Sequence, residues 1–519
     1  MKFSITRKIL FAATAVSALS VALPALAQKA KNTLRIGVAQ PISVIDAIFD
    51  PQPQANLMDR VIYDSLAAYD SDKRLVVPSL AESWTQIDPL TVEFRLRKDV
   101  KFHDGQPLDA DDVVYTVNFV IDPNVRFRFK ETRYGQITGV EKIDQYTVRI
   151  KTKAPHAPFM SRVVPQIPIL PSKAHSKSPD KSQFGRAPIG TGPYKAVMVD
   201  STKGVILQRN ADFKHGGPGQ EPGKIERIVI IPMPDEQTRT AQLMVGDVDL
   251  IYDVPTDIAD QLKANPAIEV SVRPSISFVY IALDAANRSG FNHFKDKRVR
   301  EAVLRGIDRA ALTKALQPPE IAAMPLQNSM CHPWHLGCAV SNEPPSFNPD
   351  MAKKLLAEAG FPNGFNLTIT TWGAARYAAE AAAGQLRRIG VNVTLETLTV
   401  AAFVKKRAAG ELPAYMVLWD NGGGVADVDS TAGFFYEPGD RNYNADPELA
   451  KLLEEGGREL DRAKREAIYR RMFDKVNDER YSMPVMPLAS VLAHSKDLKI
   501  SVSGTKKPEG FMFNLLEWK

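Results

Sequence analysis

Hydrophobic and polar residues along this chain follow two repeats, which together predict a mixture of strands and helices. Residues 91–97 alternate apolar and polar side chains, as in a strand with one buried face. Residues 228–231 are apolar without interruption, which is typical of a strand inside a buried sheet. In residues 296–307 the apolar side chains recur at helical spacing behind Asp296, a residue that favours a helix N-terminus. We therefore expect an α/β protein.

The C-terminal half repeats the order strand, helix, strand. Strands are predicted at residues 365–371, 391–397 and 414–419, with a helical pattern between them. This order predicts a mostly parallel sheet, and ligands of such sheets gather at the carboxyl ends of the strands. Trp372 and Trp419 lie at two of these ends and are candidates for lining a ligand site. The alternative is that both are core residues, which is the more common arrangement for tryptophan.

The first 27 residues have the parts of an export signal. Three cations precede residues 10–26, which are almost entirely apolar or small. Small residues surround the end of this stretch, so cleavage is expected after Ala27. The stretch is too short to span a bilayer as a permanent anchor. We expect a periplasmic protein whose remaining chain is long enough for two or three lobes.

Charge and motifs narrow the class of function. The net charge of +6 becomes +3 without the three leader cations, and Lys and Arg are mixed with Asp and Glu throughout. This weak bias does not indicate a nucleic-acid partner. The chain has neither the Gly-x-Ser-x-Gly of a serine hydrolase nor the His-Glu-x-x-His of a zinc peptidase. We expect no enzyme and no cofactor. An exported hydrolase with paired carboxylates is the distant alternative.

The two cysteines, Cys331 and Cys338, are seven residues apart. An even pair in an exported protein favours a disulfide that closes a small loop. His332 and His335 lie between them, and thiolates with imidazoles are also a donor set for zinc or nickel. A disulfide, free thiols and a metal site are therefore the alternatives, and the oxidising compartment favours the disulfide without a metal.

Short segments in order along the chain carry a family resemblance. The first are residues 80–84 (LAESW), residues 94–105, which end in KFHDG, and residues 108–114. The others are residues 190–194 (GTGPY), 247–249 (DVD), 296–309 (DKRVREAVLRGIDR), 352–360 (AKKLLAEAG) and 386–393 (LRRIGVNV). With these segments the chain resembles the peptide- and nickel-type solute-binding proteins of ABC importers, family 5. The resemblance covers most of the chain.

This resemblance implies a fold of the type II periplasmic binding protein class. It has two lobes, an extra small domain and a hinge between the lobes. Carried onto this chain, domain I would comprise residues 28–73, 187–273 and 497–519. Domain II would be residues 74–186, and domain III, the ligand-binding lobe, residues 274–496. The ligand would bind between the lobes, which close around it.

The resemblance also implies a function and partners. The protein would deliver a peptide or peptide-like solute to an ABC permease in the inner membrane. It would act as a monomer, and its contact with the permease would be transient. Opines, glutathione-like compounds, saccharides and nickel chelates are alternative solutes that related proteins bind.

The segment after Trp419 departs from the pattern of the peptide-binding members. Those members resemble it but have an aspartate three residues after the tryptophan, which pairs with the ammonium group of the peptide. Here this position is Gly422, and the acids of this segment are Asp420, Asp427 and Asp429. We therefore take Asp420, its neighbour Asn421 and Asp427 as candidates for the contact with the solute.

The remaining candidates are aromatic or cationic side chains near predicted strand ends or in the second domain. An aromatic wall suits a receptor that holds its solute by apolar contact, and an arginine suits a solute carboxylate. These candidates are Tyr194, Tyr280, Arg376, Arg126, Arg128 and Arg133.

Overall fold

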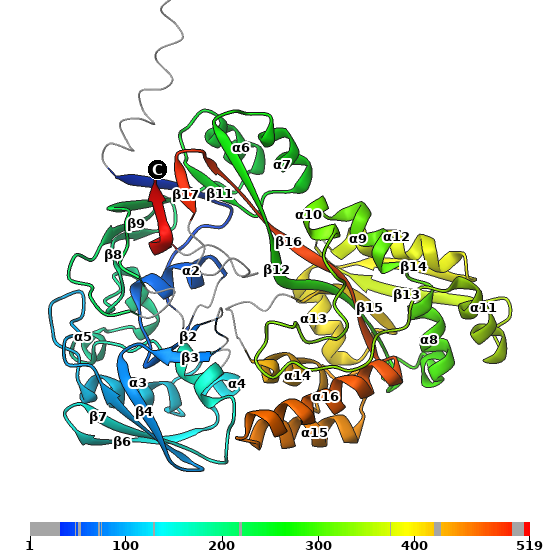
Figure 1. The fold of residues 1–519 in the computed structure, drawn as a ribbon, viewed down its shortest axis with the longest axis horizontal. Helices are drawn as coiled ribbons and strands as arrows, with labels where there is room; N and C mark the ends of the chain where they lie inside the picture. Colours follow the sequence, from blue (N-terminus) through cyan, green and yellow to red (C-terminus); the bar gives the residue numbers. More distant parts are fainter. Residues whose placement is uncertain are drawn as a thin grey trace, which may run out of the picture.

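The computed structural model describes residues 32–519 except 47, 50–52, 71–72, 74, 128–129, 217–220, 374, 420–426 and 501–512. The predicted export signal therefore lies outside the described residues. Strands and helices alternate through the rest in a mixed α/β fold, with one group of elements at the left of Figure 1 and another at the right.

One ten-stranded sheet connects the two groups of elements (Figure 1). In spatial order its strands are β14 (Val391–Thr397), β13 (Phe365–Thr371), β15 (Ala414–Trp419), β12 (Ile268–Leu283), β16 (Ser482–Ser495), β11 (Leu250–Tyr252), β1 (Thr33–Val38), β10 (Arg227–Pro232), β9 (Gly204–Arg209) and β8 (Tyr194–Asp200). The sheet therefore begins in the C-terminal half of the chain and ends in the N-terminal half.

The C-terminal part of this sheet is mixed, and the prediction of a mostly parallel sheet was wrong. β13 pairs in parallel with both β14 and β15, as the strand–helix–strand order indicates. β12 pairs antiparallel with both β15 and β16. The difference arises because β12 and β16 enter the sheet as long strands without such a crossover, so their direction is free to alternate.

β12 and β16 form a long ribbon through the middle of the molecule (Figure 1). β12 has 16 residues and β16 has 14. β16 also pairs with β11, next to β1, whereas β12 also pairs with β15. The register between the two strands shifts between Pro274 and Phe278 and again between Val279 and Tyr280. The ribbon is thus hydrogen-bonded to both halves of the sheet and irregular near its centre.

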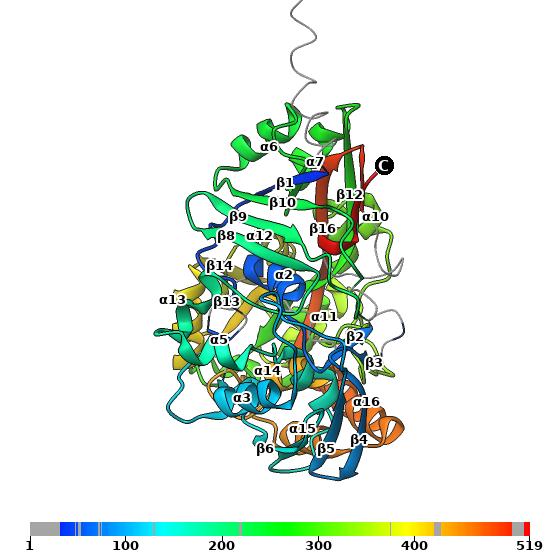
Figure 2. The ribbon, with the colours of Figure 1, turned by 90° about the vertical axis from the view of Figure 1, so that its left-hand side faces the viewer.

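A separate four-stranded antiparallel sheet lies below β8–β10 in Figure 2. Its order is β4 (Ala81–Asp88), β5 (Thr91–Leu96), β7 (Thr147–Thr152) and β6 (Ile137–Asp144). α3 (Ala110–Ile121) packs against it and begins with a capping box. Asp109 accepts a hydrogen bond from the Asp111 N–H, and Asp112 accepts one from the Asp109 N–H.

Short elements complete the N-terminal half of the chain and the C-terminus. They are α2 (Pro53–Ile62), β2 (Ala67–Asp70), β3 (Leu75–Pro78), α4 (Lys130–Tyr134), η1 (Phe159–Val163), η2 (Val164–Gln166), α5 (Ser172–Lys177), η3 (Lys181–Arg186), α6 (Glu236–Met244), α7 (Thr256–Lys263), β17 (Leu498–Ile500), η5 (Phe513–Leu515) and β18 (Leu516–Trp518). Within the described ranges, no helix has the length and apolar character needed to cross a membrane.

Two segments that carry the family resemblance meet between the small sheet and the large one. The backbone N–H of Gly190 donates to Nδ1 of His103 at 3.2 Å, and Nε2 of His103 lies 3.0 Å from the Gly192 carbonyl oxygen. Burial lowers the pKa of His103 to about 4, which keeps the imidazole in the neutral form that both contacts need. A Cβ at Gly190 would lie 1.9 Å from the Ile62 carbonyl oxygen, so this position requires glycine.

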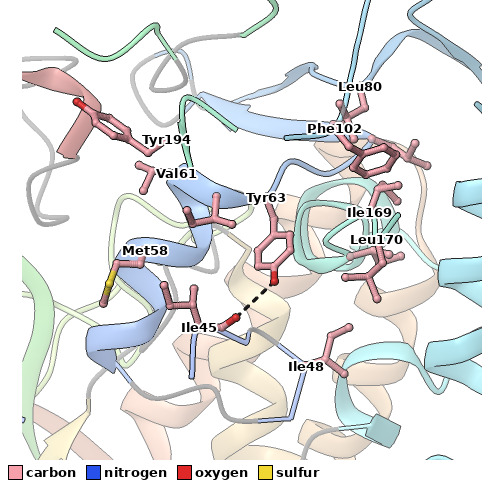
Figure 3. Close-up of a cluster of buried hydrophobic side chains, with 14 of the residues drawn as sticks. Ile45, Ile48, Met58, Val61, Tyr63, Leu80, Phe102, Ile169, Leu170 and Tyr194 are labelled. Atoms are coloured by element: carbon pink, nitrogen blue, oxygen red, sulfur yellow. Dashed lines mark hydrogen bonds between the residues drawn. The ribbon is translucent and has the colours of Figure 1, made fainter. Parts of the chain in front are cut away.

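One hydrophobic core runs through the N-terminal half, from β1 and α2 to the small sheet. Figure 3 shows part of it around Tyr63, whose hydroxyl donates to the Ile45 carbonyl oxygen at 3.5 Å. Met58 and Val61 of α2 belong to the same cluster as Phe102, next to the small sheet. The elements at the left of Figure 1 therefore share a core.

The C-terminal half has cores on both faces of its sheet, because residues of β12 alternate between them. Val279 and Ile281 belong to one core, whereas Phe278 and Tyr280 belong to the other. The first core includes residues of η4 (Asn292–Lys295), α8 (Lys297–Arg305), α9 (Arg309–Leu316), α11 (Pro349–Glu358) and α12 (Ala375–Arg387), with α10 (Pro319–Ala322) beside β12. The second includes residues of α13 (Val400–Ala409), α14 (Val428–Tyr436), α15 (Pro447–Arg458) and α16 (Arg462–Glu479).

Candidate ligand-binding site

Trp372 and Trp419 lie at the ends of neighbouring parallel strands. Trp372 directly follows β13, and Trp419 is the last residue of β15. In the register of this pair Thr370 lies opposite Tyr415, which places Trp372 level with Val417. Trp419 is two residues further along the strand, and residues two apart lie on the same face, so Trp372 and Trp419 share a face. Both are partly buried and pack against the core that contains α13 and α14. The structure thus brings the two predicted tryptophans to one edge of the sheet.

Aromatic side chains from α14 pack against Trp419. The ring centroids of Trp419 and Phe434 are 4.3 Å apart, and those of Trp419 and Phe435 are 5.1 Å apart. α14 begins nine residues after the end of the strand, and these ring contacts place it over the same strand end. The result is a group of aromatic rings at the carboxyl end of β15.

The indole N–H groups of both tryptophans are buried without a hydrogen-bond partner among the described residues. A buried donor that lacks a partner costs about 1–3 kcal/mol, so native proteins contain few of them. Two such donors at adjacent strand ends are available to acceptor atoms of a bound molecule. The indole N–H of Trp518, in β18, is also without a partner in the described part of the chain, but it lies in another sheet.

Arg407, near the end of α13, is a buried cation in the same aromatic group. Its exposed fraction is 7%, and its guanidinium lies 5.4 Å from the ring centroid of Phe403 and 5.1 Å from that of Phe434. Its Nε is buried without a hydrogen-bond partner, and no ion pair joins it to a carboxylate in the described ranges. No sequence pattern indicates this residue as a binding residue, because an arginine near a helix end is usually exposed.

Tyr280 and Tyr194, two further candidates for the ligand site, are both buried in the core. Tyr280 is 1% exposed and packs edge-on against Phe435 and Tyr415. Tyr194 is fully buried, and its hydroxyl donates to the Ile225 carbonyl oxygen at 2.9 Å. Both occupy strand positions that face a packed layer, so neither presents its ring to a solute.

The carboxylate of Asp427 is already paired with a cation. It is fully buried, and Arg465 donates to its two oxygens at 2.9 and 2.6 Å. Burial raises the pKa of Asp427, but the charge and hydrogen bonds of Arg465 outweigh it and hold the pKa below the usual range. This candidate carboxylate therefore already has a cation as its partner. Asp420 and Asn421 lie outside the described residues.

The predicted arginines are not gathered at one place. Arg376 is exposed at the start of α12, where its guanidinium lies 4.8 Å from the ring of Tyr377 and its Nε 3.8 Å from Glu380. Arg133 lies in α4 and Arg126 precedes that helix, whereas Arg128 lies outside the described residues. None of the contacts given for the described arginines joins them to Trp372 or Trp419.

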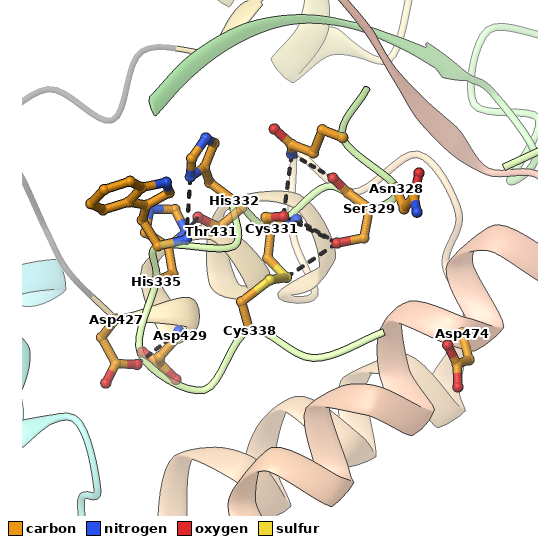
Figure 4. Close-up of a disulfide and its surroundings, with 12 residues drawn as sticks. Asn328, Ser329, Cys331, His332, His335, Cys338, Asp427, Asp429, Thr431 and Asp474 are labelled. Carbon is orange, nitrogen blue, oxygen red and sulfur yellow. Dashed lines mark hydrogen bonds between the residues drawn. A yellow bond between two sulfur atoms is a disulfide. The ribbon is translucent and has the colours of Figure 1, made fainter. Parts of the chain in front are cut away.

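Cys331 and Cys338 are joined by a disulfide (Figure 4). The bond removes the thiolates that a metal site would use, and no cluster of three or more metal-binding side chains occurs among the described residues. Burial lowers the pKa of His332 to about 3. Nδ1 of His335 lies 3.4 Å from the Thr431 hydroxyl on α14. The loop therefore packs against α14.

A small cavity lies apart from these candidates. Its lining includes Asp46, Tyr63, Leu170, His175 and Phe184. None of the residues predicted to bind a solute lines it. We base the site on the strand ends and their unpartnered donors, because these carry the chemistry of recognition.

The family of bacterial extracellular solute-binding proteins, family 5, matches residues 76–458. The chain belongs to this family. The glutathione-binding protein GsiB of Pectobacterium atrosepticum is 27% identical over 488 residues, which cover 89% of this chain and 90% of the relative. Heme-binding protein A of Haemophilus influenzae is 28% identical over 418 residues, 75% of this chain and 74% of the relative.

The fold comparison agrees with this membership. The structure of HbpA2 from Haemophilus parasuis aligns with a TM-score of 0.79 and 25% identity, covering 94% of this chain and all of that one. The predicted family and the type II periplasmic binding fold are thus confirmed. The chain is a solute-binding receptor of an ABC importer, and both relatives named above are binding proteins.

Proposed function

We propose that this receptor binds a short peptide-like solute with a free carboxylate at Trp372, Trp419 and Arg407. The observation that carries the proposal is the buried Arg407 guanidinium, which has no carboxylate partner among the described residues. A guanidinium binds a carboxylate through charge-assisted hydrogen bonds, often two in parallel. The surrounding aromatic rings exclude water, which strengthens such a contact.

The aromatic site supports a solute that is partly apolar. Trp419, Phe434 and Phe435 supply flat apolar surface, and the two indole N–H groups supply donors for carbonyl or carboxylate oxygens. Peptides combine these features, because each peptide unit has a carbonyl oxygen and the chain ends in a carboxylate. We propose that Asp420 and Asn421, directly after Trp419, contact the ammonium end of the solute.

Glutathione is the first compound to test. It is a small peptide with free carboxylates, and the relative GsiB is named for binding it. The similarity of 27% supports the solute class and leaves the choice among peptides to measurement.

We also propose the arrangement that encloses the solute. Residues 28–73, 187–273 and 497–519 form domain I, residues 74–186 domain II and residues 274–496 domain III, with the solute held between the lobes. The core shared by domains I and II and the separate cores of domain III support the division into two lobes. The register shift of the ribbon near Pro274 supports a hinge there.

The cellular role follows from the family and the leader sequence. We propose that the export signal is removed after Ala27 and that the mature protein works as a monomer in the periplasm. Closure around the solute presents a face to the permease, which makes a transient contact and receives the solute unchanged. The differential affinity of the solute for the closed state supplies the free energy of closure.

The test begins with the protein purified under native conditions. Mass spectrometry of material released by denaturation identifies a co-purified solute. The protein freed of solute in this way is refolded, and isothermal titration calorimetry then measures the affinity of the refolded protein for that solute. We expect a peptide or glutathione-like compound, recovered without chemical change.

Glutathione and a panel of di- and tripeptides are then titrated, each with its C-terminal amide as the matched control. An amide keeps the shape but lacks the carboxylate charge, so we expect its affinity to fall about tenfold or more. Binding of a neutral saccharide instead, or equal affinity for acid and amide, would show that Arg407 is not a carboxylate site.

A further inference from the structure

Two acidic side chains at the start of α14 contact residues that belong to the other half of the molecule. The hydroxyl of Ser161 donates to Asp427 Oδ2 at 2.6 Å, and Arg162 Nη1 lies 2.5 Å from Asp429 Oδ2. Ser161 and Arg162 lie in η1, whose neighbours Phe159 and Val163 belong to the N-terminal core. Val428, between the two acids, belongs to a C-terminal core. The contact therefore joins two separately packed bodies.

A backbone hydrogen bond extends the same contact. The N–H of Ala157 donates to the Gly457 carbonyl oxygen at 2.9 Å. Gly457 lies in α15, which packs against α14 and α16. Three consecutive contacts thus link residues 157–162 to the C-terminal half.

The carboxylates are held in place from their own side. Arg465 of α16 donates to both oxygens of Asp427 and, through Nε, to the Gly456 carbonyl oxygen at 2.9 Å. The Tyr469 hydroxyl donates to Asp429 Oδ1 at 3.1 Å. Asp427 also accepts the backbone N–H of Asp429 at 2.9 Å as the N-cap of α14. These partners remain when the opposite half is removed.

The loop closed by the disulfide contacts the start of α14, where these acids lie. The N–H of Val428 donates to the Leu336 carbonyl oxygen at 3.0 Å, and Leu336 forms a bridge with Asp427. Leu336 lies between the bonded Cys331 and Cys338 (Figure 4). The start of α14 is therefore fixed by the loop on one side and by α16 on the other.

The burial of the pairs explains why the contact can be reversible. Arg162 and Asp429 keep side-chain exposures of 19% and 12%. When the halves separate, Asp427 retains Arg465, Asp429 retains Tyr469, and Arg162 becomes hydrated. Separation therefore leaves no buried charge without a partner, and its cost is that of two hydrogen bonds, one from Ser161 and one from the Ala157 backbone, and a partly exposed ion pair.

We propose that Ser161, Arg162, Asp427 and Asp429 form an interlobe latch that stabilises the closed receptor. The latch contributes to the free energy of closure independently of the solute. It therefore affects how long any solute is held. The proposal rests on the division into lobes given under the proposed function, but not on the identity of the solute.

The test measures the separation of the halves in the absence of solute. Thr85→Cys on β4 and Lys451→Cys on α15 place nitroxide labels at exposed positions on the two halves, and the native cysteines are oxidised and do not react. Double electron–electron resonance then gives the distribution of distances between the two labels. It is measured with the latch residues intact and with the Ser161→Ala/Arg162→Ala substitutions.

We expect the latch variant to raise the ratio of open to closed molecules about tenfold, the effect of one hydrogen bond and one partly exposed ion pair. Asp429→Asn should act in the same direction. The control is Arg149→Ala, which breaks a 2.9 Å ion pair with Glu93 inside the small sheet and should leave the distribution unchanged. Circular dichroism verifies that each variant is folded.

A distribution that is the same in the wild type and in both latch variants would overturn the proposal, as would a wild type that is fully open. Neither outcome depends on which solute binds. Conversely, failure of every peptide to bind would overturn the proposed function while the change in distance on breaking the latch still supports the latch. Stopped-flow release of the identified solute should be about tenfold faster in the latch variant.

Discussion

The interlobe latch and the aromatic site are only eight residues apart along the chain, yet they treat polar groups in opposite ways. At the latch, Asp427 accepts hydrogen bonds from Arg465, Ser161 and the Asp429 backbone. At the aromatic site, the indole N–H groups of Trp372 and Trp419 and the Nε of Arg407 have no partner among the described residues. One region is complete by itself, and the other has unused hydrogen-bonding capacity.

Whether a buried polar group already has a hydrogen-bond partner distinguishes structural residues from recognition residues better than the residue type does. An aspartate beside a predicted ligand site is a natural candidate for binding, but a carboxylate that already pairs with an arginine has little affinity left for a solute. A buried donor without a partner has the opposite character, because a solute acceptor removes its desolvation cost. The predictions below test whether the two regions behave as these contacts indicate.

The largest effect is expected from Arg465→Ala. The substitution leaves the fully buried Asp427 without its cation, and loss of one partner of a buried pair costs about 3–5 kcal/mol. Guanidinium chloride denaturation measures the free energy of unfolding. Arg462→Ala, which breaks an exposed pair with Glu466 on the same helix, is the control and should cost less than about 1 kcal/mol. Equal losses in the two variants would contradict the structural role of Asp427.

Arg407→Met should weaken solute binding about 10–100-fold, because it removes hydrogen bonds to a charged group. Calorimetry with the co-purified solute measures the effect. Lys405→Met removes an exposed cation from the same helix and should leave the affinity unchanged. If Arg407→Met lowers stability but leaves the dissociation constant unchanged, the guanidinium belongs to the core and the comparison with the latch fails.

Acid should destabilise the N-terminal half through His103. Its folded-state pKa of about 4 lies below the ordinary value of about 6.5. The unfolded state therefore binds more protons between these values, so stability is present above pH 6.5 and is lost as the pH falls toward 4. The loss at pH 5 should be about 1–2 kcal/mol. His103→Gln should flatten the dependence of the melting temperature on pH, and an unchanged slope would contradict the assignment.

The smallest effect is expected from removal of single indole donors. Trp372→Phe and Trp419→Phe keep an aromatic ring but lose the N–H, so each should weaken solute binding about fivefold. Trp518→Phe is the matched control, since its N–H is also without a partner in the described part of the chain but lies in the β17–β18 sheet. An equal effect from all three substitutions would indicate a general loss of packing.

Local patterns predicted the elements of the C-terminal half well. The strands β13, β14 and β15 have the predicted bounds, and Asn348, Asp446 and Asp461, residue types that favour a helix N-terminus, cap α11, α15 and α16. Each of these features depends on residues close together in sequence. A cap needs one side chain and the N–H groups of the next turn, and a buried strand needs only its own apolar residues.

The ribbon was missed for the same reason. No strand is predicted over β16, which contains Pro484 and Pro487. Proline normally argues against a central strand. The strand forms because β12, some 200 residues earlier in the chain, pairs with it around irregular positions. Such long-range pairing leaves no local signal.

The place of the two tryptophans could be predicted from the sequence, but their surroundings could not. The order of the strands alone brings Trp372 and Trp419 to one edge of the sheet. The pairing of Asp427 leaves no local signal, because its partner Arg465 lies 38 residues away in another helix. Arg407 was missed because only the packing of α13 and α14 buries it.

The β12–β16 ribbon has a consequence for how the receptor cycles. Two hydrogen-bonded strands flex readily out of the plane of their ladder and resist shear within it, because shear breaks hydrogen bonds between them. A connection of this kind guides the halves along one arc, where two independent loops would allow them to swivel. The rims would then meet in the same alignment on every stroke, so that Ser161 and Arg162 return to the same two carboxylates.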